Sequence, residues 1–341
     1  MPDTPGPKIS VLVPTYNRAP LLKNFLASIL GQTFRDFELI VADNCSTDST
    51  PDVVRGFNDP RLRYHRHDRN IGPFANMNYL IAQARGAYIC IVHDDDMYFP
   101  TFLERESDML DRHPEVGMVH SAVYEVDADG KRRQVVRAYP QTTVLRGKDE
   151  FVRYMEGHNV CCSSVMARAQ LYRDNPFDPR FLCADFLMWM KFALRADVGY
   201  IAEPLLEMRV HGDTVTSWLN PMRWHDEFMA IAEEGFTLGS QTYPALASQR
   251  DALFQRAGRA QGRRFLTAGL AAVSRGDFEL ARGYTAVLER LRALGLPRSY
   301  SLTARLLTNR PGRRLLQVIA GVRRGRARRL SERSGAKAVQ A

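Results

Sequence analysis

Short β-branched apolar runs alternate with longer amphipathic stretches up to residue 112, and this alternation constrains the fold more than any other feature. Residues 8–13 (KISVLV) predict a buried strand that Pro14 is expected to end, and apolar side chains then recur at helical spacing over 21–30. The same patterns predict strands at 37–43, 62–68 and 87–93, and helices at 74–85 and 100–112. Such alternation is typical of an α/β fold with a mostly parallel, Rossmann-like sheet flanked by helices, whose ligands bind at the carboxyl ends of the strands.

The pattern changes after residue 112. An Asp129-Gly130 turn predicts a pair of antiparallel strands around it. Further elements are expected as helices near 147–156 and 183–196 and strands near 160–168 and 198–211, and only helical patterns follow from about 219, with a helix pair turning at 275–277. We therefore expect one α/β domain over residues 1–218, an all-helical extension over 219–310 and a basic tail over 311–341.

Composition is that of an ordinary globular protein. A chain of 341 residues with 45% hydrophobic content is long enough for a sizeable α/β domain and a smaller appendage. The start of the chain (MPDTPGPKIS) lacks the pattern of a secretion signal, and no apolar run approaches the ~18 residues that cross a bilayer. The five cysteines are odd in number and lack paired spacing, which argues against disulfides or a zinc site. These features predict a cytoplasmic location.

The basic tail supplies most of the net charge. Residues 311–341 hold nine Lys and Arg against one acid, so they carry +8 of the total of +9. Residues 312–324 mix apolar and Arg side chains in a way that favours an amphipathic helix on an anionic inner membrane surface, whereas the rest of the tail is typical of a disordered segment. Arginine clusters also neutralise nucleic-acid phosphates, but no stacking aromatic or recognition motif accompanies them.

Three consecutive carboxylates, Asp94, Asp95 and Asp96, follow the strand expected at 87–93. Neighbouring carboxylates repel each other unless a cation neutralises them, and their hard oxygen atoms suit Mg²⁺ or Mn²⁺. In isolation, such a run is more often a solvated acidic turn. Its place directly after a buried strand favours a ligand site instead.

Polar residues also follow the first two strands. Asp43 ends the strand at 37–43, and its carboxylate could accept hydrogen bonds from a nucleotide base or a ribose. The segment Pro14-Thr15-Tyr16-Asn17 brings an aromatic ring and an amide to the same sheet edge. Helix capping and turn formation are competing explanations of both segments.

Taken in order, the segments VPTYNR, VADNCSTDST and RNIGPFANMNYLIAQARGAYICIVHDDD resemble the inverting family 2 glycosyltransferases, which have the GT-A fold. The resemblance covers about residues 8–215. It implies that Asp95 is the principal ligand of a metal ion on the donor diphosphate, with Asp94 near the ribose or the metal and Asp96 as a further ligand. The other donor-binding residues that it implies are Pro14, Thr15, Tyr16, Asn17, Asp43, Asn44 and Arg69.

The same resemblance implies a general base and one more metal ligand. Asp185, in CADFL, aligns with the acidic motif that begins a helix in this family, and a carboxylate there could take the proton of a sugar hydroxyl. A plain first-turn charge beside the helix dipole is the simpler interpretation of Asp185. Ala184 stands where the family often has Glu. His211 lies where many GT-A enzymes have a histidine that reaches the metal or the diphosphate, although a lone His is more often structural.

These features predict an inverting glycosyltransferase that uses Mg²⁺ or Mn²⁺ and a UDP-, GDP- or dTDP-sugar, with Asp185 as the base. The expected acceptor is a hydroxyl of a glycan or lipid-linked glycan, in cell-surface polysaccharide or glycolipid synthesis, at or near the inner face of the membrane. The alternative is a nucleic-acid- or membrane-binding protein that uses the basic tail and has a catalytically silent donor-binding domain. Sugar-nucleotide synthesis would need a Gly-rich basic loop after the first strand, which PTYNRAP does not provide.

Overall fold

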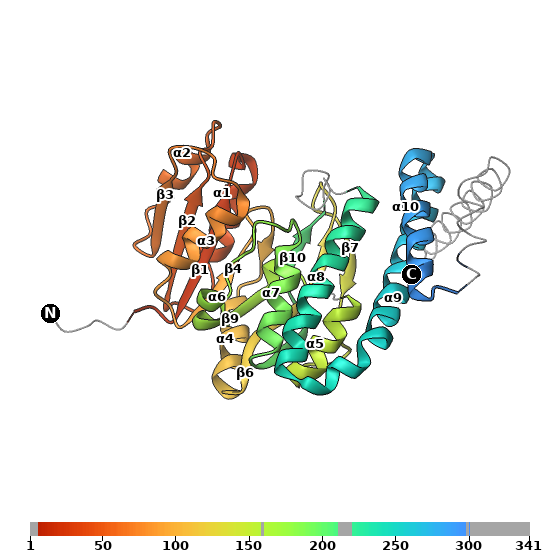
Figure 1. Cartoon of the computed structure of the whole chain (residues 1–341). Helices are drawn as coiled ribbons and strands as arrows, with labels where there is room; N and C mark the ends of the chain where they lie inside the picture. The colour runs from red at the N-terminus through yellow and green to blue at the C-terminus, as the bar shows by residue number, and fades with distance from the viewer. Residues whose placement is uncertain (1–5, 158–159, 211–219, 298–299, 301–341) are drawn as a thin grey trace, which may run out of the picture. The chain divides into compact units, whose positions relative to one another are not determined.

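A computed structural model describes residues 6–157, 160–210, 220–297 and 300. The chain divides into two compact units (Figure 1). The first comprises Met1–Thr216 and Ile231–Pro244, and the second comprises Ser217–Ala230 and Ala245–Ala341.

The first unit is built on a ten-stranded sheet with the order β3-β2-β1-β4-β9-β6-β10-β5, in which β7 pairs with β6 and β8 with β10. The strands are β1 (Ile9–Thr15), β2 (Phe37–Asp43), β3 (Leu62–Arg66), β4 (Tyr88–Ile91), β5 (Met97–Tyr98), β6 (Val116–Val126), β7 (Arg132–Val136), β8 (Thr143–Leu145), β9 (Val165–Arg168) and β10 (Asp197–Arg209). Strands β3, β2, β1 and β4 are parallel, and the antiparallel β9 lies between β4 and β6, so β6 and β10 run in the same direction as β1. The predicted mostly parallel sheet is therefore confirmed.

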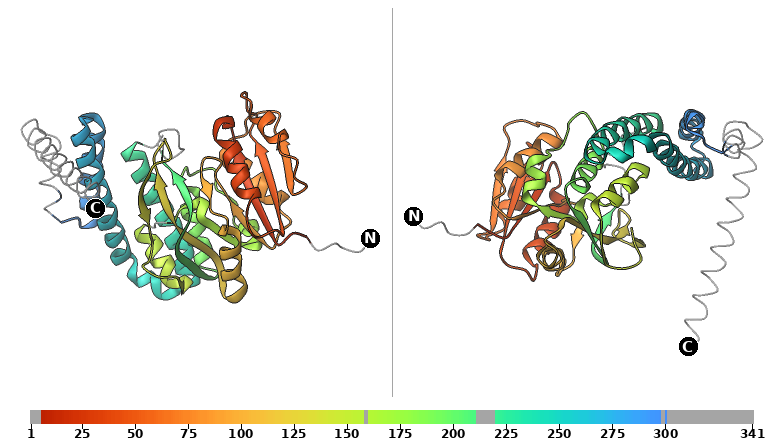
Figure 2. Two further views of the ribbon diagram at one scale, coloured as in Figure 1. Left: turned by 180° about the vertical axis from the view of Figure 1, so that it is seen from behind. Right: turned by 60° about the horizontal axis from the view of Figure 1, so that its bottom comes forward.

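Helices cover both faces of this sheet. They are α1 (Ala19–Leu30), α2 (Thr50–Arg55), α3 (Pro73–Gln83), α4 (Phe102–Arg112), α5 (Gly147–Glu156), α6 (Ala169–Asp174) and α7 (Ala184–Ala193). Helices α1, α2 and α4 share one apolar core with the strands, whereas α3 contacts α6 and α5 contacts α7 on the other side (Figure 2). The predicted flanking of the sheet by helices is thus confirmed as well.

Three local predictions needed correction. Strand β1 continues through Pro14 to Thr15 and pairs with β2 along its whole length. It pairs with β4 only as far as Leu12, so the missing N–H of Pro14 falls where that second ladder has ended. The strand expected at 160–168 begins with a 3₁₀ turn, η1 (Cys162–Ser164), and only then becomes β9. The short elements β5, β8, α2 and α6 were not predicted.

The second unit is helical in its described residues. Helix α8 (Pro221–Thr242) belongs to this unit only up to Ala230, and its remaining residues belong to the first unit. The later elements are η3 (Pro244–Gln249), α9 (Arg250–Arg275), α10 (Phe278–Leu291) and η4 (Arg292–Leu294). The predicted turn between α9 and α10 is present: Gly276 adopts φ +82°, and the Asp277 side chain caps α10 by accepting a hydrogen bond from Leu280 N (3.0 Å). The predicted C-terminal helical region is therefore confirmed, and the basic tail over 311–341 lies outside the described residues. Among the described helices, none combines the length and the apolar character that crossing a membrane requires.

Candidate active site

The predicted site residues of the first half of the chain gather at the carboxyl ends of β1, β2 and β4. Thr15 and Asp43 are partners in the parallel register of β1 and β2, so they lie side by side at the end of the two strands. Strand β4 pairs with the other side of β1 through Leu12 and Ile91, and the acidic run follows it. Sheet topology alone therefore places Thr15, Asp43 and the three aspartates along one edge.

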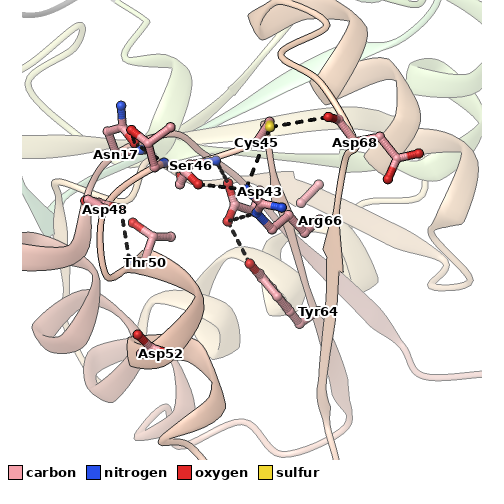
Figure 3. A network of polar contacts seen from close by, with 12 residues as sticks. Asn17, Asp43, Cys45, Ser46, Asp48, Thr50, Asp52, Tyr64, Arg66 and Asp68 are labelled. Atoms are coloured by element: carbon pink, nitrogen blue, oxygen red, sulfur yellow. Dashed lines mark hydrogen bonds and ion pairs between the residues drawn. The ribbon is translucent and has the colours of Figure 1, made fainter.

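The Asp43 carboxylate is fully buried and held on both oxygens (Figure 3). Its Oδ1 accepts a hydrogen bond from Ser46 N (2.7 Å), and its Oδ2 accepts one from the Tyr64 hydroxyl (2.6 Å), with Arg66 Nε at 3.9 Å. Burial and the bond to Asp43 raise the pKa of Tyr64, so the phenol stays a donor. Asp43 is thus locked in one orientation before any ligand arrives.

Asn17 links the loop after β1 to the loop after β2 (Figure 3). Its side-chain oxygen accepts a hydrogen bond from Thr47 N (2.8 Å), and its backbone N donates one to Ser46 Oγ (2.9 Å). Asn17 has φ +53° and Cys45 has φ +68°, a left-handed conformation that L-residues seldom adopt outside turns. The two loops therefore support each other, and they leave Tyr16 with 44% of its surface exposed.

Asn44 and Arg69 take different places. The buried Asn44 amide donates to Asn70 Oδ1 (2.8 Å) and accepts from Ile71 N (2.8 Å), so it fixes the turn that precedes α3. The Arg69 side chain is exposed and has no hydrogen bond or ion pair within the described part of the chain. The structure thus gives Asn44 a structural role, and a donor contact by either residue stays a prediction.

Asp94 and Asp95 share one cation. Arg18 Nε lies 3.8 Å from Asp94 Oδ1, and Arg18 Nη2 lies 3.8 Å from Asp95 Oδ2. Asp94 is 6% exposed, and burial, with the Asp95 charge added, raises its pKa to about 7 against the opposing effects of the nearby Thr15 hydroxyl and of Arg18. Thr15 Oγ1 and Asp94 Oδ2 are both buried and, although they are close enough to affect each other, neither has a hydrogen bond of good geometry in the described structure. Such orphaned buried acceptors are costly unless a ligand or ion satisfies them.

Asp96 is held more firmly than its two neighbours. Its Oδ2 accepts a hydrogen bond from Ser163 Oγ (2.6 Å), and its Oδ1 accepts one from Arg209 N (2.9 Å). Burial raises its pKa to about 6. Arg209 also donates through Nε to the Asp95 carbonyl (3.2 Å), which ties the end of β10 to the acidic run.

His93 completes a cluster that suits a divalent cation. One ligand atom each of His93, Asp95 and Asp96 lies within 4.8 Å of the others. Carboxylate oxygen and imidazole nitrogen are accepted by Mn²⁺, and carboxylates by Mg²⁺. Together with the orphaned Asp94 oxygen, this donor set fits the predicted metal ion. Sequence reasoning gave His93 no role, although it stands directly before the acids.

Asp185 lies in the first turn of α7, whose N-cap is Cys183. Burial raises the pKa of Asp185, and the charge of a protonated His93 opposes the rise. The same His93 charge also opposes the rise in the pKa of Asp94 and of Asp96. His93 therefore interacts electrostatically with all three acids. His211 lies outside the described residues.

Residues 10–175 match the family model described as Glycosyl transferase family 2. This region of the chain is similar to the family 2 glycosyltransferases. It contains all the site residues predicted on β1, β2 and β4, whereas Asp185 and His211 follow the matched region.

Solved structures support the GT-A fold. The S. aureus TarS 1-349 structure in complex with UDP-GlcNAc has a TM-score of 0.61 at 20% identity, covering 93% of this chain and 92% of that one. The mannosyltransferase PcManGT from Pyrobaculum calidifontis, in complex with GDP-Man and Mn2+, has a TM-score of 0.50 at 21% identity, covering 92% and 88%.

Sequence relatives of this region include a protein named for polysaccharide synthesis. The putative colanic acid biosynthesis glycosyl transferase WcaA of Escherichia coli is 34% identical over 184 residues, which are 52% of this chain and 63% of that protein. The chain spans 32% to 35% of the length of three other curated relatives that it matches.

Proposed function

We propose that this protein is an inverting, metal-dependent glycosyltransferase that uses a nucleoside-diphosphate sugar as donor. The similarity to the family 2 glycosyltransferases supports sugar transfer. Two proteins of similar fold were solved with UDP-GlcNAc and with GDP-Man and Mn2+, which supports a nucleotide-sugar donor without choosing its base or its sugar.

The convergence of two carboxylate groups carries the proposal. The acidic run follows β4 and Asp185 begins α7, about ninety residues later in the chain. His93 nevertheless affects the pKa of Asp94, Asp96 and Asp185 together. A site that grips a diphosphate and also holds a separate base is what transfer to a hydroxyl requires.

Residues at different positions in the site have different proposed roles. Asp43, fixed by Tyr64 and Ser46, presents a preformed acceptor for a base or a ribose at the end of β2, and the exposed Tyr16 ring lies on the next loop. Asp95, with Asp96 and His93, would hold Mg²⁺ or Mn²⁺, which when bound neutralises charge on the diphosphate leaving group. His211 stays a proposed additional ligand.

Asp185 would remove the proton from the acceptor hydroxyl. Burial raises its pKa above the usual carboxyl value, which makes the carboxylate a stronger base. Because Asp185 acts on the acceptor and forms no bond to the sugar, the hydroxyl attacks the anomeric carbon once, from the face opposite the diphosphate. One displacement inverts the configuration.

The acceptor is proposed to be a hydroxyl of a cell-surface polysaccharide or of a lipid-linked glycan. The name of the WcaA relative supports polysaccharide synthesis. A lipid-linked acceptor would suit a protein that touches the inner membrane surface through its basic residues at 311–341.

A donor screen tests this function. The full-length protein is heated with UDP-GlcNAc, UDP-glucose, GDP-mannose and a dTDP-sugar, each with and without Mn²⁺, and its unfolding temperature is recorded. We expect at least one donor to stabilise the protein only when Mn²⁺ is present. The donor identified in this way is then used in a transfer reaction, and NMR of the product should show the inverted anomer. A retained anomer would refute the single displacement, and the absence of any Mn²⁺-dependent donor would refute the donor class.

A further inference from the structure

Arg18 lies between two carboxylates of the acidic run. Its guanidinium is 3.8 Å from Asp94 through Nε and 3.8 Å from Asp95 through Nη2, and its side chain is only 25% exposed. A partly buried cation at this position lowers the repulsion between the two carboxylates. It also occupies space and charge next to the cluster formed by His93, Asp95 and Asp96.

The backbone of Arg18 is fixed, whereas its side chain is long. Arg18 is the N-cap of α1: its N donates to Thr50 Oγ1 (3.2 Å), and its carbonyl accepts from Leu21 N and Leu22 N (3.0 Å each). A rotation of the Arg18 side chain would leave these backbone hydrogen bonds intact. A planar guanidinium binds carboxylate and phosphate oxygens with similar geometry.

Two other arginines near the site donate hydrogen bonds to backbone carbonyls. Arg209 donates to the carbonyls of Asp95 (3.2 Å), Asp127 (3.2 Å) and Ala128 (2.6 Å). Arg66 donates to the Ser46 carbonyl (2.9 Å) and faces Asp43. Moving either one would break hydrogen bonds to backbone carbonyls, whereas the Arg18 guanidinium lies 3.8 Å from two carboxylate side chains of the acidic run.

We propose that Arg18 is an exchangeable counter-ion, which balances Asp94 and Asp95 in the metal-free protein and turns to the donor diphosphate when a divalent cation binds. A guanidinium and a divalent cation beside the same carboxylates repel each other. The arriving diphosphate supplies oxygens that can receive the displaced guanidinium. This inference rests on the proposed function, and it assigns a positioning role to a residue outside the predicted donor-binding set.

The exchange makes metal and nucleotide binding depend on each other. Without nucleotide, Arg18 opposes the metal, and with nucleotide the opposition disappears because Arg18 has a new partner. By linkage, each ligand then strengthens the binding of the other by the same factor. Arg18 would thus favour joint binding of the cation and the diphosphate.

The test compares wild type, Arg18→Gln and Arg18→Lys in binding experiments. Free Mn²⁺ is followed by electron paramagnetic resonance during titration of the full-length protein, alone and with UDP or GDP. In Arg18→Gln, we expect Mn²⁺ alone to bind about tenfold tighter, which corresponds to about 1.4 kcal/mol. The factor by which nucleotide strengthens Mn²⁺ binding should fall at least as much. Arg18→Lys retains the charge and should stay close to wild type.

A gain in metal affinity separates this role from a structural one, because a damaged site would bind Mn²⁺ more weakly. The matched control is Arg105→Gln, which removes an exposed arginine of α4 whose ion-pair partner is Glu203 (3.2 Å) and not an acid of the run. It should match wild type, and thermal unfolding shows whether each variant is folded. Unchanged or weaker Mn²⁺ binding by folded Arg18→Gln overturns the inference while leaving the proposed function intact. If neither UDP nor GDP affects Mn²⁺ binding in the wild type, the proposed function and the inference fall together.

Discussion

The Ser163 hydroxyl donates a 2.6 Å hydrogen bond to Oδ2 of Asp96, a residue 67 positions earlier in the chain. This bond joins the 3₁₀ turn before β9 to the acidic run after β4. Arg209 N binds the other oxygen of Asp96, so both oxygens are held from neighbouring segments. Asp96 therefore fixes the shape of the acidic run, and the orphaned oxygen of Asp94 and the carboxylate of Asp95 are the parts of the run best suited to a ligand.

Ser163→Ala should cost stability and weaken metal binding. The substitution leaves a buried Asp96 oxygen without its donor, which costs about 1–3 kcal/mol. Urea unfolding measures this loss, and Mn²⁺ titration should show weaker binding because the run is less well held. Ser240→Ala, which removes an exposed bond to the Thr237 carbonyl (3.0 Å), is the control and should change neither quantity. Equal stability of Ser163→Ala and wild type would contradict this role.

The burial of Asp94 should make the metal-free protein less stable as the pH rises. Its pKa is raised from 3.8 to about 7, so the folded state binds this proton more tightly than the unfolded state. Such a group lowers stability progressively as the pH increases from about 4 to about 7. Asp94→Asn cannot ionise, so in EDTA it should lose much of this slope and be more stable than wild type at pH 8.

Urea unfolding of both proteins between pH 4.5 and pH 8 tests this prediction. Parallel stability curves for wild type and Asp94→Asn would show that the buried carboxylate contributes no pH dependence. Mn²⁺ affinity of the wild type should change in the opposite direction, increasing with pH through about 6 to 7, because the ion needs deprotonated Asp94 and Asp96.

Asp185→Asn should remove transfer while leaving donor binding intact. The amide has nearly the same shape but cannot accept the acceptor proton, so the rate of transfer should fall about 10²–10⁴-fold. Nucleotide affinity with Mn²⁺, measured by calorimetry, should stay within about twofold of wild type because Asp185 lies outside the acidic run. Normal turnover by Asp185→Asn would refute its assignment as the base.

Glu38→Gln should destabilise the fold without affecting the site. Glu38 is buried at the opposite end of β2 and accepts hydrogen bonds from Ser10 Oγ (2.7 Å), Arg63 Nη1 (2.8 Å) and Arg85 N, Nε and Nη2 (2.8–3.0 Å). Burial alone would raise its pKa, but these bonds outweigh burial and lower it. The loss should be about 2–4 kcal/mol at pH 7, reduced because both arginines are partly exposed.

The pH dependence of Glu38→Gln distinguishes the lost charge from a general defect. A carboxylate whose pKa is lowered by folding stabilises the protein at pH values above its unfolded-state pKa of 4.5. This stabilisation disappears as the pH falls below that value. The difference from wild type in urea unfolding should therefore shrink at acid pH. Glu203→Gln removes an exposed ion pair and should cost less than about 1 kcal/mol. A Glu38→Gln protein with weaker nucleotide binding would contradict the separation of this network from the site.

Sequence reasoning reached the elements whose signals are local. Strand β2 is a mainly apolar run that ends in Asp43, and the acidic run follows β4 directly, so pattern and position together indicated the sheet edge. The short helices α2 and α6 have six residues each, too few to show a helical period. Pro14 was expected to end β1. The strand continues because Pro14 lacks its backbone N–H only where the pairing of β1 with β4 has already ended.

The contacts that organise the site depend on tertiary structure. Arg18 and Asp94 are 76 positions apart, and Ser163 and Asp96 are 67 apart, so no spacing rule could pair them. Arg18 lies within the VPTYNR segment, and its positive charge next to a predicted diphosphate site could have indicated a role for it in the site. His93 received no role because its nearness to Asp185 depends on how α7 packs against the sheet.

The most direct test is calorimetric titration of UDP and GDP into wild type and Asp95→Ala, each with Mn²⁺ and with EDTA. If the acidic run binds a cation that carries a diphosphate, at least one nucleotide should bind wild type about tenfold tighter or more with Mn²⁺, and Asp95→Ala should lose this gain. Equal affinity with Mn²⁺ and with EDTA for both nucleotides, or an undiminished gain in Asp95→Ala, would contradict it.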